Sequence, residues 1–138
     1  MDLKYMQTFL VAPAHAAVGL TSVSLGIVRA LQNLGGQVCF VKPVAQGDDD
    51  ASAHFAREIF RIEVPAPISL AKATERLAAN QSGELQEEIV ALCMKGSQNC
   101  NALVVEGLHA GVSNTFTAQL NIDIANSLTA GIVVAVAG

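Results

Sequence analysis

Short apolar runs that alternate with helical patterns constrain this chain more than any other feature of its sequence. The runs do not alternate between polar and apolar residues, which is typical of strands buried on both faces of a sheet. Strands separated by helices predict right-handed βαβ units, and therefore a parallel sheet. The predicted strands are residues 6–12, 37–44, 102–105 and 132–136, with the last two expected to be buried neighbours that run parallel to the second.

The segments between the predicted strands carry apolar residues at helical spacing. In the first segment this stripe is followed by Gly35-Gly36, where a helix end favours glycine. Pro65 and Pro67 mark a linker further along the chain. The predicted helices contain Val23, Ile27, Leu31 and Leu34; Phe55, Ile59 and Ile62; residues 69–79; residues 84–94, with Ser82 as N-cap; and Leu120, Ile124 and Leu128.

The size and composition of the chain predict one domain with a layered core. Hydrophobic residues make up 51% of the 138 residues and charged residues 14%, which is too apolar for a disordered chain. We expect an α/β fold with a doubly wound, mostly parallel sheet in three α/β/α layers. Because the sequence stops at Gly138, directly after a predicted buried strand, residues 1–138 are interpreted as a truncated domain.

Charge and cysteine usage exclude several classes of function. The net charge is −4 and Lys and Arg form no cluster, so neither nucleic acid nor an anionic membrane is expected as a partner. The chain shows no membrane-length apolar run and no signal peptide, which predicts a cytoplasmic protein. Cys39, Cys93 and Cys100 lack metal-site spacing and are interpreted as reduced thiols, with Cys39 in the core and no metal bound.

The loop after the first predicted strand resembles an incomplete phosphate-binding loop. Such a loop needs glycines, a Lys for the β- and γ-phosphates and a Ser or Thr hydroxyl for Mg²⁺. Gly19, Thr21 and Ser22 fit, but Leu20 stands where the Lys belongs and Ala14 where the first glycine belongs. A plain helix start capped by Thr21 or Ser22 is the alternative. His15 lies in the same loop, where it would either contact a bound anion or simply be exposed to solvent.

Two charged residues stand at the ends of predicted strands. Lys42 ends the second strand and Glu106 the third, so both are expected at the edge of the sheet where parallel α/β folds bind ligands. An ion pair between the two is the alternative to a role in ligand binding. Asp48-Asp49-Asp50 supplies either a further metal-ligand position or a solvated turn before a helix.

These motifs, in this order, resemble the dethiobiotin synthetase type of P-loop NTPase fold. The segments are Val18–Gly26 (VGLTSVSLG), Lys42–Gly47 (KPVAQG) and Val104–Gly107 (VVEG). With Leu in place of Lys, the first segment is more similar to the N-terminal domain of the long form of bacterial phosphate acetyltransferases. Residues 87–91 and 105–108 also look like that family. The resemblance covers most of residues 6–138.

The resemblance implies roles for these positions. Ala14, His15, Gly19, Leu20, Thr21 and Ser22 would form a degenerate phosphate loop. Lys42 would be a vestigial substrate position and Glu106 a vestigial Mg²⁺ position, with Thr21 as the third member of that set. No residue of this chain is expected to be catalytic, no cofactor is expected, and ATP with Mg²⁺ is not expected to bind or turn over.

The function implied is that of a regulatory or architectural domain. The parent enzyme would transfer an acetyl group between acetyl-CoA and phosphate, using a C-terminal catalytic domain that this chain does not contain. Its expected partners are that domain, further copies of the protein and a small-metabolite effector. The alternative is an ATP-dependent carboxylase or amidoligase of the dethiobiotin synthetase or cobyrinate synthase kind. A partitioning-type ATPase is a third hypothesis. Leu20 argues against both of these ATP-dependent functions, because each depends on the lysine that it replaces.

Overall fold

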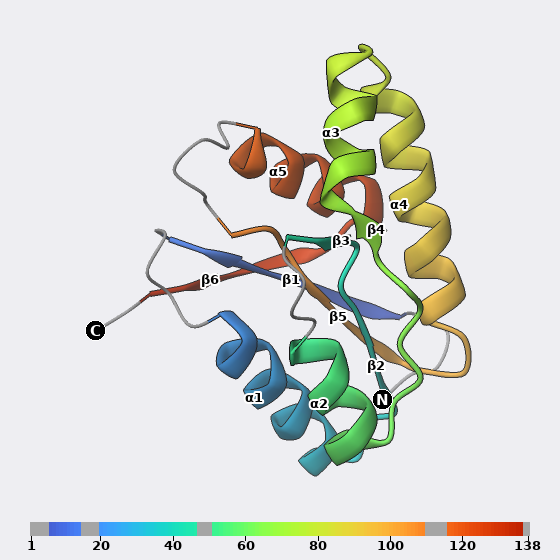
Figure 1. The fold of residues 1–138 in the computed structure, drawn as a ribbon. Helices are drawn as coiled ribbons and strands as arrows, with labels where there is room; N and C mark the ends of the chain where they lie inside the picture. The colour runs from blue at the N-terminus through green and yellow to red at the C-terminus, as the bar shows by residue number, and fades with distance from the viewer. Residues whose placement is uncertain (1–5, 15–19, 47–50, 110–115, 137–138) are drawn as a thin grey trace.

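The computed structural model describes residues 6–14, 20–46, 51–109 and 116–136, which form a three-layer α/β/α fold (Figure 1). The middle layer is a four-stranded sheet in the order β2-β5-β1-β6, and every pair in it is parallel. The predicted parallel α/β architecture is therefore confirmed. The strands of this sheet are β1 (Gln7–Pro13), β2 (Val38–Val41), β5 (Ala102–Glu106) and β6 (Gly131–Ala135).

Helices cover both faces of the sheet (Figure 1). Two helices pack on one face and three on the other, as a doubly wound topology requires. A separate parallel sheet of two short strands, β3 (Val44–Ala45) and β4 (Ile68–Ser69), lies beside the second set. The first set is α1 (Leu20–Asn33) and α2 (Ala51–Phe60), and the second is α3 (Leu70–Ala78), α4 (Ser82–Gly96) and α5 (Thr117–Leu128).

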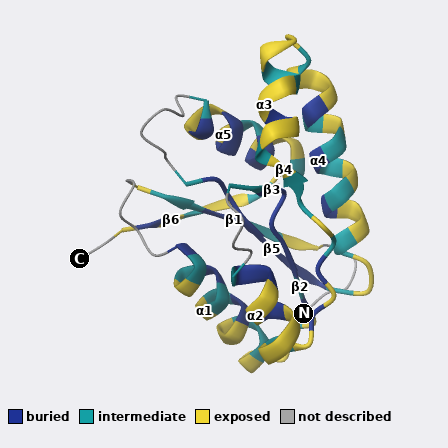
Figure 2. Ribbon diagram, in the orientation of Figure 1, coloured by how far each residue is buried: buried dark blue, intermediate teal, exposed yellow. Residues whose placement is uncertain are grey.

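Successive residues of the central strands feed two core clusters, one on each side of the sheet. Leu10 packs with the core under α3, α4 and α5, whereas Val11 packs with the core under α1 and α2. This follows from the two-residue period of a strand. All five residues of β5 are buried, and Figure 2 shows this strand in the colour of buried residues. Both faces of β5 are therefore covered, as its continuous apolar run predicts.

The prediction for residues 132–136 is wrong in two respects. β6 is parallel, but it pairs with β1, so β1 separates it from β5. It also lies at the margin of the described sheet, where Ile132 is 51% and Val134 57% exposed. Ile132 shares a register row with Leu10, and Leu10 packs on the α5 side of the sheet. An apolar run indicates that a strand can be covered, but it does not say which segment covers it.

The predicted strand over residues 37–44 is divided in the structure. Pro43 has no N–H group to continue the ladder, and its carbonyl instead accepts a hydrogen bond from the Ile68 N–H at 2.8 Å. Val44 consequently belongs to the small second sheet. The predicted helix over 69–79 is confirmed, with Ser69 as its N-cap, but Ser82 is the first residue of α4 and Gln81 is its N-cap.

Two predicted apolar faces also differ from the structure. Phe55 and Ile59 are 41% and 55% exposed, because α2 packs through small residues that let it approach α1 closely. Ile62 lies beyond the end of α2, and Leu34 beyond the end of α1 is 81% exposed. Cys39 is only partly buried, whereas Cys93 is 1% exposed, and all three thiols are free. The small buried residues of α2 are Ser52, Ala53 and Ala56.

Candidate functional site

The carboxyl ends of β1, β5 and β2 lie side by side and carry the polar residues that the sequence singles out. Val41 pairs with Val105 in the parallel register, so the next residues, Lys42 and Glu106, follow at the same level. Ala14 follows β1, is exposed, and donates its N–H to the Ala135 carbonyl at 2.8 Å. The sheet order thus brings Lys42 and Glu106 together. Ala14 instead lies at the end of β1 and is hydrogen-bonded to β6.

Lys42 and Glu106 form a buried ion pair. The Lys42 Nζ lies 3.3 Å from the Glu106 Oε2, and the two side chains are 9% and 0% exposed. The Ser52 hydroxyl, itself fully buried on α2, donates to the same Oε2 at 2.8 Å. The Glu106 Oε1 is buried and has no hydrogen-bond partner among the described residues. The ion pair that the sequence left as an alternative is therefore present.

Helix α1 begins at Leu20, where a phosphate loop would present its lysine. Leu20 is fully buried and belongs to the same core cluster as Val11 and Phe40. Thr21 is partly exposed and Ser22 exposed, so the hydroxyl groups lie toward the surface. His15, Gly19 and Asp48–Asp50 lie outside the described residues. At position 20, a side chain that would contact phosphate is thus replaced by one that packs in the core.

Two side-chain amides fix the segment that follows β5. Asn121 on α5 accepts from the Leu108 N–H at 2.8 Å and donates to the Leu108 carbonyl at 3.0 Å. Gln46 accepts from the His109 N–H at 2.6 Å and donates to the His109 carbonyl at 2.9 Å. Each amide imitates a neighbouring strand by satisfying both backbone groups of one residue. Neither residue is among the site residues predicted from the sequence, although Gln46 lies within the KPVAQG motif.

Gly107 lies between Glu106 and this fixed segment, and its lack of a side chain has a clear steric reason. A Cβ at this position would lie 2.6 Å from the Asn121 Oδ1 and 3.0 Å from the Val11 carbonyl oxygen. The Gly107 N–H donates to the same Val11 carbonyl at 2.8 Å. Glycine therefore lets the segment continue close beside β1 after Glu106, so this backbone approach helps to hold the carboxylate in place.

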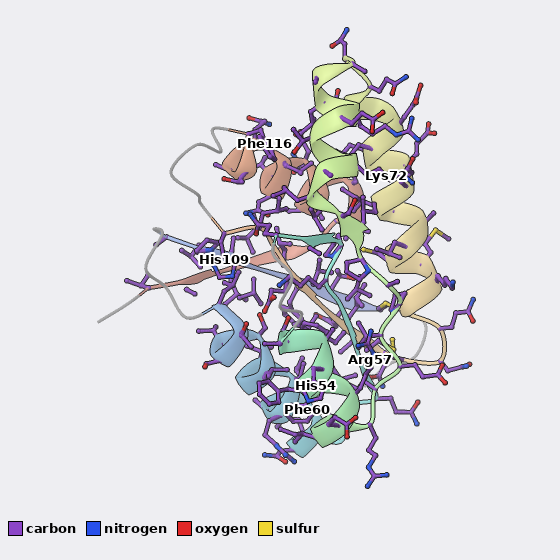
Figure 3. All side chains as sticks on the ribbon, in the orientation of Figure 1. His54, Arg57, Phe60, Lys72, His109 and Phe116 are labelled. Atoms are coloured by element: carbon purple, nitrogen blue, oxygen red, sulfur yellow. The ribbon has the colours of Figure 1, made fainter. Side chains whose placement is uncertain are left out.

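A separate cavity of about 820 Å³ opens at the opposite edge of the sheet. Arg57, Arg61 and Lys95 line it, and Figure 3 shows Arg57 and His109 toward opposite ends of the sheet. Cys39 and Cys100 line it as well. Burial, then a hydrogen bond with the neighbouring Cys100 and its charge, raises the pKa of Cys39 to about 12, so at neutral pH its thiol stays protonated and is a poor nucleophile.

The described residues of the candidate site hold charges and hydrogen bonds. Lys42 and Ser52 both contact the Glu106 Oε2, and Leu20 offers no polar group. Among the residues that the structure describes, no group of three or more His, Cys, Asp or Glu side chains is placed to hold a metal ion. No described helix is long and apolar enough to cross a membrane.

Known proteins match the chain over nearly all of its length. It is 38% identical over 133 residues to phosphate acetyltransferase from Pseudomonas putida, 36% over 129 residues to that of Deinococcus radiodurans, and 33% over 130 residues to that of Escherichia coli. These alignments cover 93%, 91% and 90% of this chain. The chain spans only 19%, 18% and 18% of the length of those relatives.

The predicted similarity to phosphate acetyltransferases is thus confirmed as a similarity to part of these proteins. A family model described as an AAA domain matches residues 7–138, which is nearly the whole chain and includes every described strand and helix. The match agrees with the parallel sheet and with the position of α1 as the first helix after β1. The chain therefore belongs to the AAA domain family.

Proposed function

We propose that this chain is a non-catalytic regulatory or architectural domain of a phosphate acetyltransferase. One observation carries the proposal: the Leu20 side chain, at the lysine position of the phosphate loop, is fully buried in the apolar core. A lysine in that place supplies charge-assisted contacts to phosphate, and leucine supplies none. The domain would keep the fold of a nucleotide-binding protein without its chemistry.

The condition of the remaining site residues supports the same proposal. Lys42 is committed to Glu106, and Ser52 adds a second donor to the same carboxylate oxygen. A group that acts as an acid, a base or a nucleophile needs access to a reacting atom, and these side chains are nearly closed to solvent. Acetyl transfer would then take place elsewhere in the longer protein, in a region that the relatives possess beyond the matched fifth of their length.

The proposed role is tested in the full-length protein that carries this segment. Residues 1–138 are deleted, and acetyl phosphate formation, assembly mass and the response to small metabolites are compared with those of the intact protein. We expect acetyl transfer to persist while assembly or metabolite response changes. Complete loss of acetyl transfer in a remaining part that is folded and assembled as before would overturn the proposal.

A second assay addresses the alternative, an ATP-dependent carboxylase or amidoligase. Steady turnover of Mg-ATP is measured for the intact protein and for Thr21→Ala, which removes the hydroxyl that a phosphate loop offers to the metal. We expect no turnover that depends on Thr21. Turnover that disappears in Thr21→Ala would favour the alternative and contradict a non-catalytic domain.

A further inference from the structure

The resemblance to P-loop enzymes implies a Mg²⁺ ion at Glu106, and the described residues do not fit one. Mg²⁺ requires near-octahedral oxygen ligands and gives up its water reluctantly. The Glu106 Oε2 already accepts from Lys42 and Ser52, and the Oε1 is sealed from solvent. Among the described residues, Glu106 belongs to no group of three or more His, Cys, Asp or Glu side chains that could hold a metal ion. The donor set around Glu106 is that of an ion pair.

We infer that the Lys42 ammonium is the resident cation of Glu106 and closes this carboxylate to divalent metal ions. A metal bound to Glu106 would lie close to the Lys42 Nζ, which is 3.3 Å from the carboxylate oxygen. The repulsion between the two cations would be strong, because both side chains are largely removed from water. The N-terminal end of α2, which places Ser52 beside Glu106, adds partial positive charge.

The same geometry describes a latent metal site. The Glu106 Oε1 has lone pairs that no described residue uses, and Lys42 occupies only one side of the other oxygen. Replacing Lys42 by a neutral residue leaves a buried carboxylate without a charged partner, so that a proton or a metal ion can take the place of the ammonium group. The Ser52 hydroxyl, 2.8 Å from the Oε2, then lies within reach of water bound to that cation. The Lys42 side chain thus determines whether the Glu106 carboxylate can bind a metal ion.

The experiment measures Mn²⁺ binding to the 138-residue chain by electron paramagnetic resonance and titration calorimetry. We expect Glu106 to contribute nothing in the wild type, so Glu106→Gln should bind Mn²⁺ as the wild type does. Lys42→Met should gain affinity of about ten-fold or more, the size of effect that a neighbouring charge has on a carboxylate. Lys42→Met/Glu106→Gln should lose that gain.

A matched control removes a lysine from an exposed pair. Lys72 lies 3.5 Å from Glu88 and is 53% exposed, so Lys72→Met should leave Mn²⁺ binding unchanged. A wild-type Mn²⁺ site that Glu106→Gln abolishes would overturn the inference, and this comparison holds even if Lys42→Met does not fold. A folded Lys42→Met variant that gains no Glu106-dependent binding would overturn it as well.

Discussion

The two edges of the central sheet carry charges in different ways. At the carboxyl edge, Lys42 and Glu106 are buried and paired one to one. At the amino edge, Arg57, Arg61 and Lys95 line a cavity of about 820 Å³ and are exposed to water. Among the described residues, the amino edge therefore has a cavity with three exposed basic side chains, whereas the carboxyl edge has a single buried ion pair.

Helix ends explain the difference. Helices α1 and α4 precede β2 and β5 and end at the amino edge, where α2 also ends beside the cavity. Their free carbonyl groups make this edge partly negative, and cations near helix C-termini offset that charge. Arg57 and Lys95 accordingly lie in the last turns of α2 and α4, and Arg57 also donates to the Val64 carbonyl, in the segment after α2, at 3.1 Å. The basic residues of the cavity thus have a structural role at helix ends. Helix ends alone do not explain why Lys42 and Glu106 form a buried ion pair.

The largest effect is expected from breaking the buried pair. Lys42→Met should lower the free energy of unfolding by about 3–5 kcal/mol, because it leaves the Glu106 carboxylate buried without its counter-ion. The double variant Lys42→Met/Glu106→Gln should recover most of this loss, since it removes both charges. Urea denaturation of the single and double variants measures the coupling.

The exposed pair on α3 and α4 gives the control for this prediction. Lys72→Met should change the free energy of unfolding by no more than about 1 kcal/mol, because solvent screens its pair with Glu88 and because Arg76, 2.8 Å from the same carboxylate, remains as a partner. Equal losses in Lys42→Met and Lys72→Met would show that burial does not distinguish the carboxyl edge from the rest of the surface.

Leu20 provides the next largest expected effect. Leu20→Ala should lower the free energy of unfolding by about 2–5 kcal/mol, because Leu20 is fully buried, whereas Leu34→Ala should change it little, because Leu34 is 81% exposed. Leu20→Lys restores the phosphate-loop residue but places an ammonium group at a core position. It should therefore destabilise the fold without ATP turnover. Thermal unfolding and an ATPase assay measure both, and a stable Leu20→Lys variant would show that the site can reopen.

Gly107→Ala should have a smaller effect, of about 1–3 kcal/mol, because the added Cβ overpacks a closely packed position. Its nearest neighbour, Asn121, is held by two hydrogen bonds to Leu108 and cannot easily move away. Gly26→Ala is the matched control: apart from its chain neighbours and the backbone of its own helix, no described atom lies within 4 Å of its added Cβ, and alanine should stabilise α1 by about 0.5–1 kcal/mol. Denaturation curves in which both variants behave alike would contradict the steric role of Gly107.

The sequence could predict the carboxyl edge because strand ends are local features. Lys42 and Glu106 each directly follow an apolar run, and parallel strands bring such residues to one edge. The ion pair between them depends on the strand order, which places β2 next to β5. The local sequence pattern does not specify the order of the strands in the sheet, so an ion pair and ligand binding both remain open from the sequence alone.

Other features depend on contacts that no local pattern contains. Ser52 reaches Glu106 only because α2 packs against that end of the sheet, and Gln46 and Asn121 bind backbone groups, which are the same in every sequence. The exposure of Ile132 depends on which segment covers β6. The fold class and most elements are therefore predictable from periodicity, whereas partners across the tertiary structure are not.

The smallest effect concerns alkaline pH and Cys93, which lies near the end of α4 that faces the amino edge. Burial raises the pKa of Cys93 from 9.0 to about 12, so between these values the folded state holds a proton that the unfolded state has lost. Stability therefore falls as pH rises through this window, with a slope of up to about 1.4 kcal/mol per pH unit.

Cys93→Ala should be less stable than the wild type near neutral pH, and the difference should shrink above about pH 9, because alanine does not titrate. Urea denaturation of both proteins from about pH 8 to about pH 10 measures this narrowing. A constant difference would mean that the Cys93 site opens to water before the thiol ionises, and the amino edge would then be looser than the carboxyl edge in its core as well as at its surface.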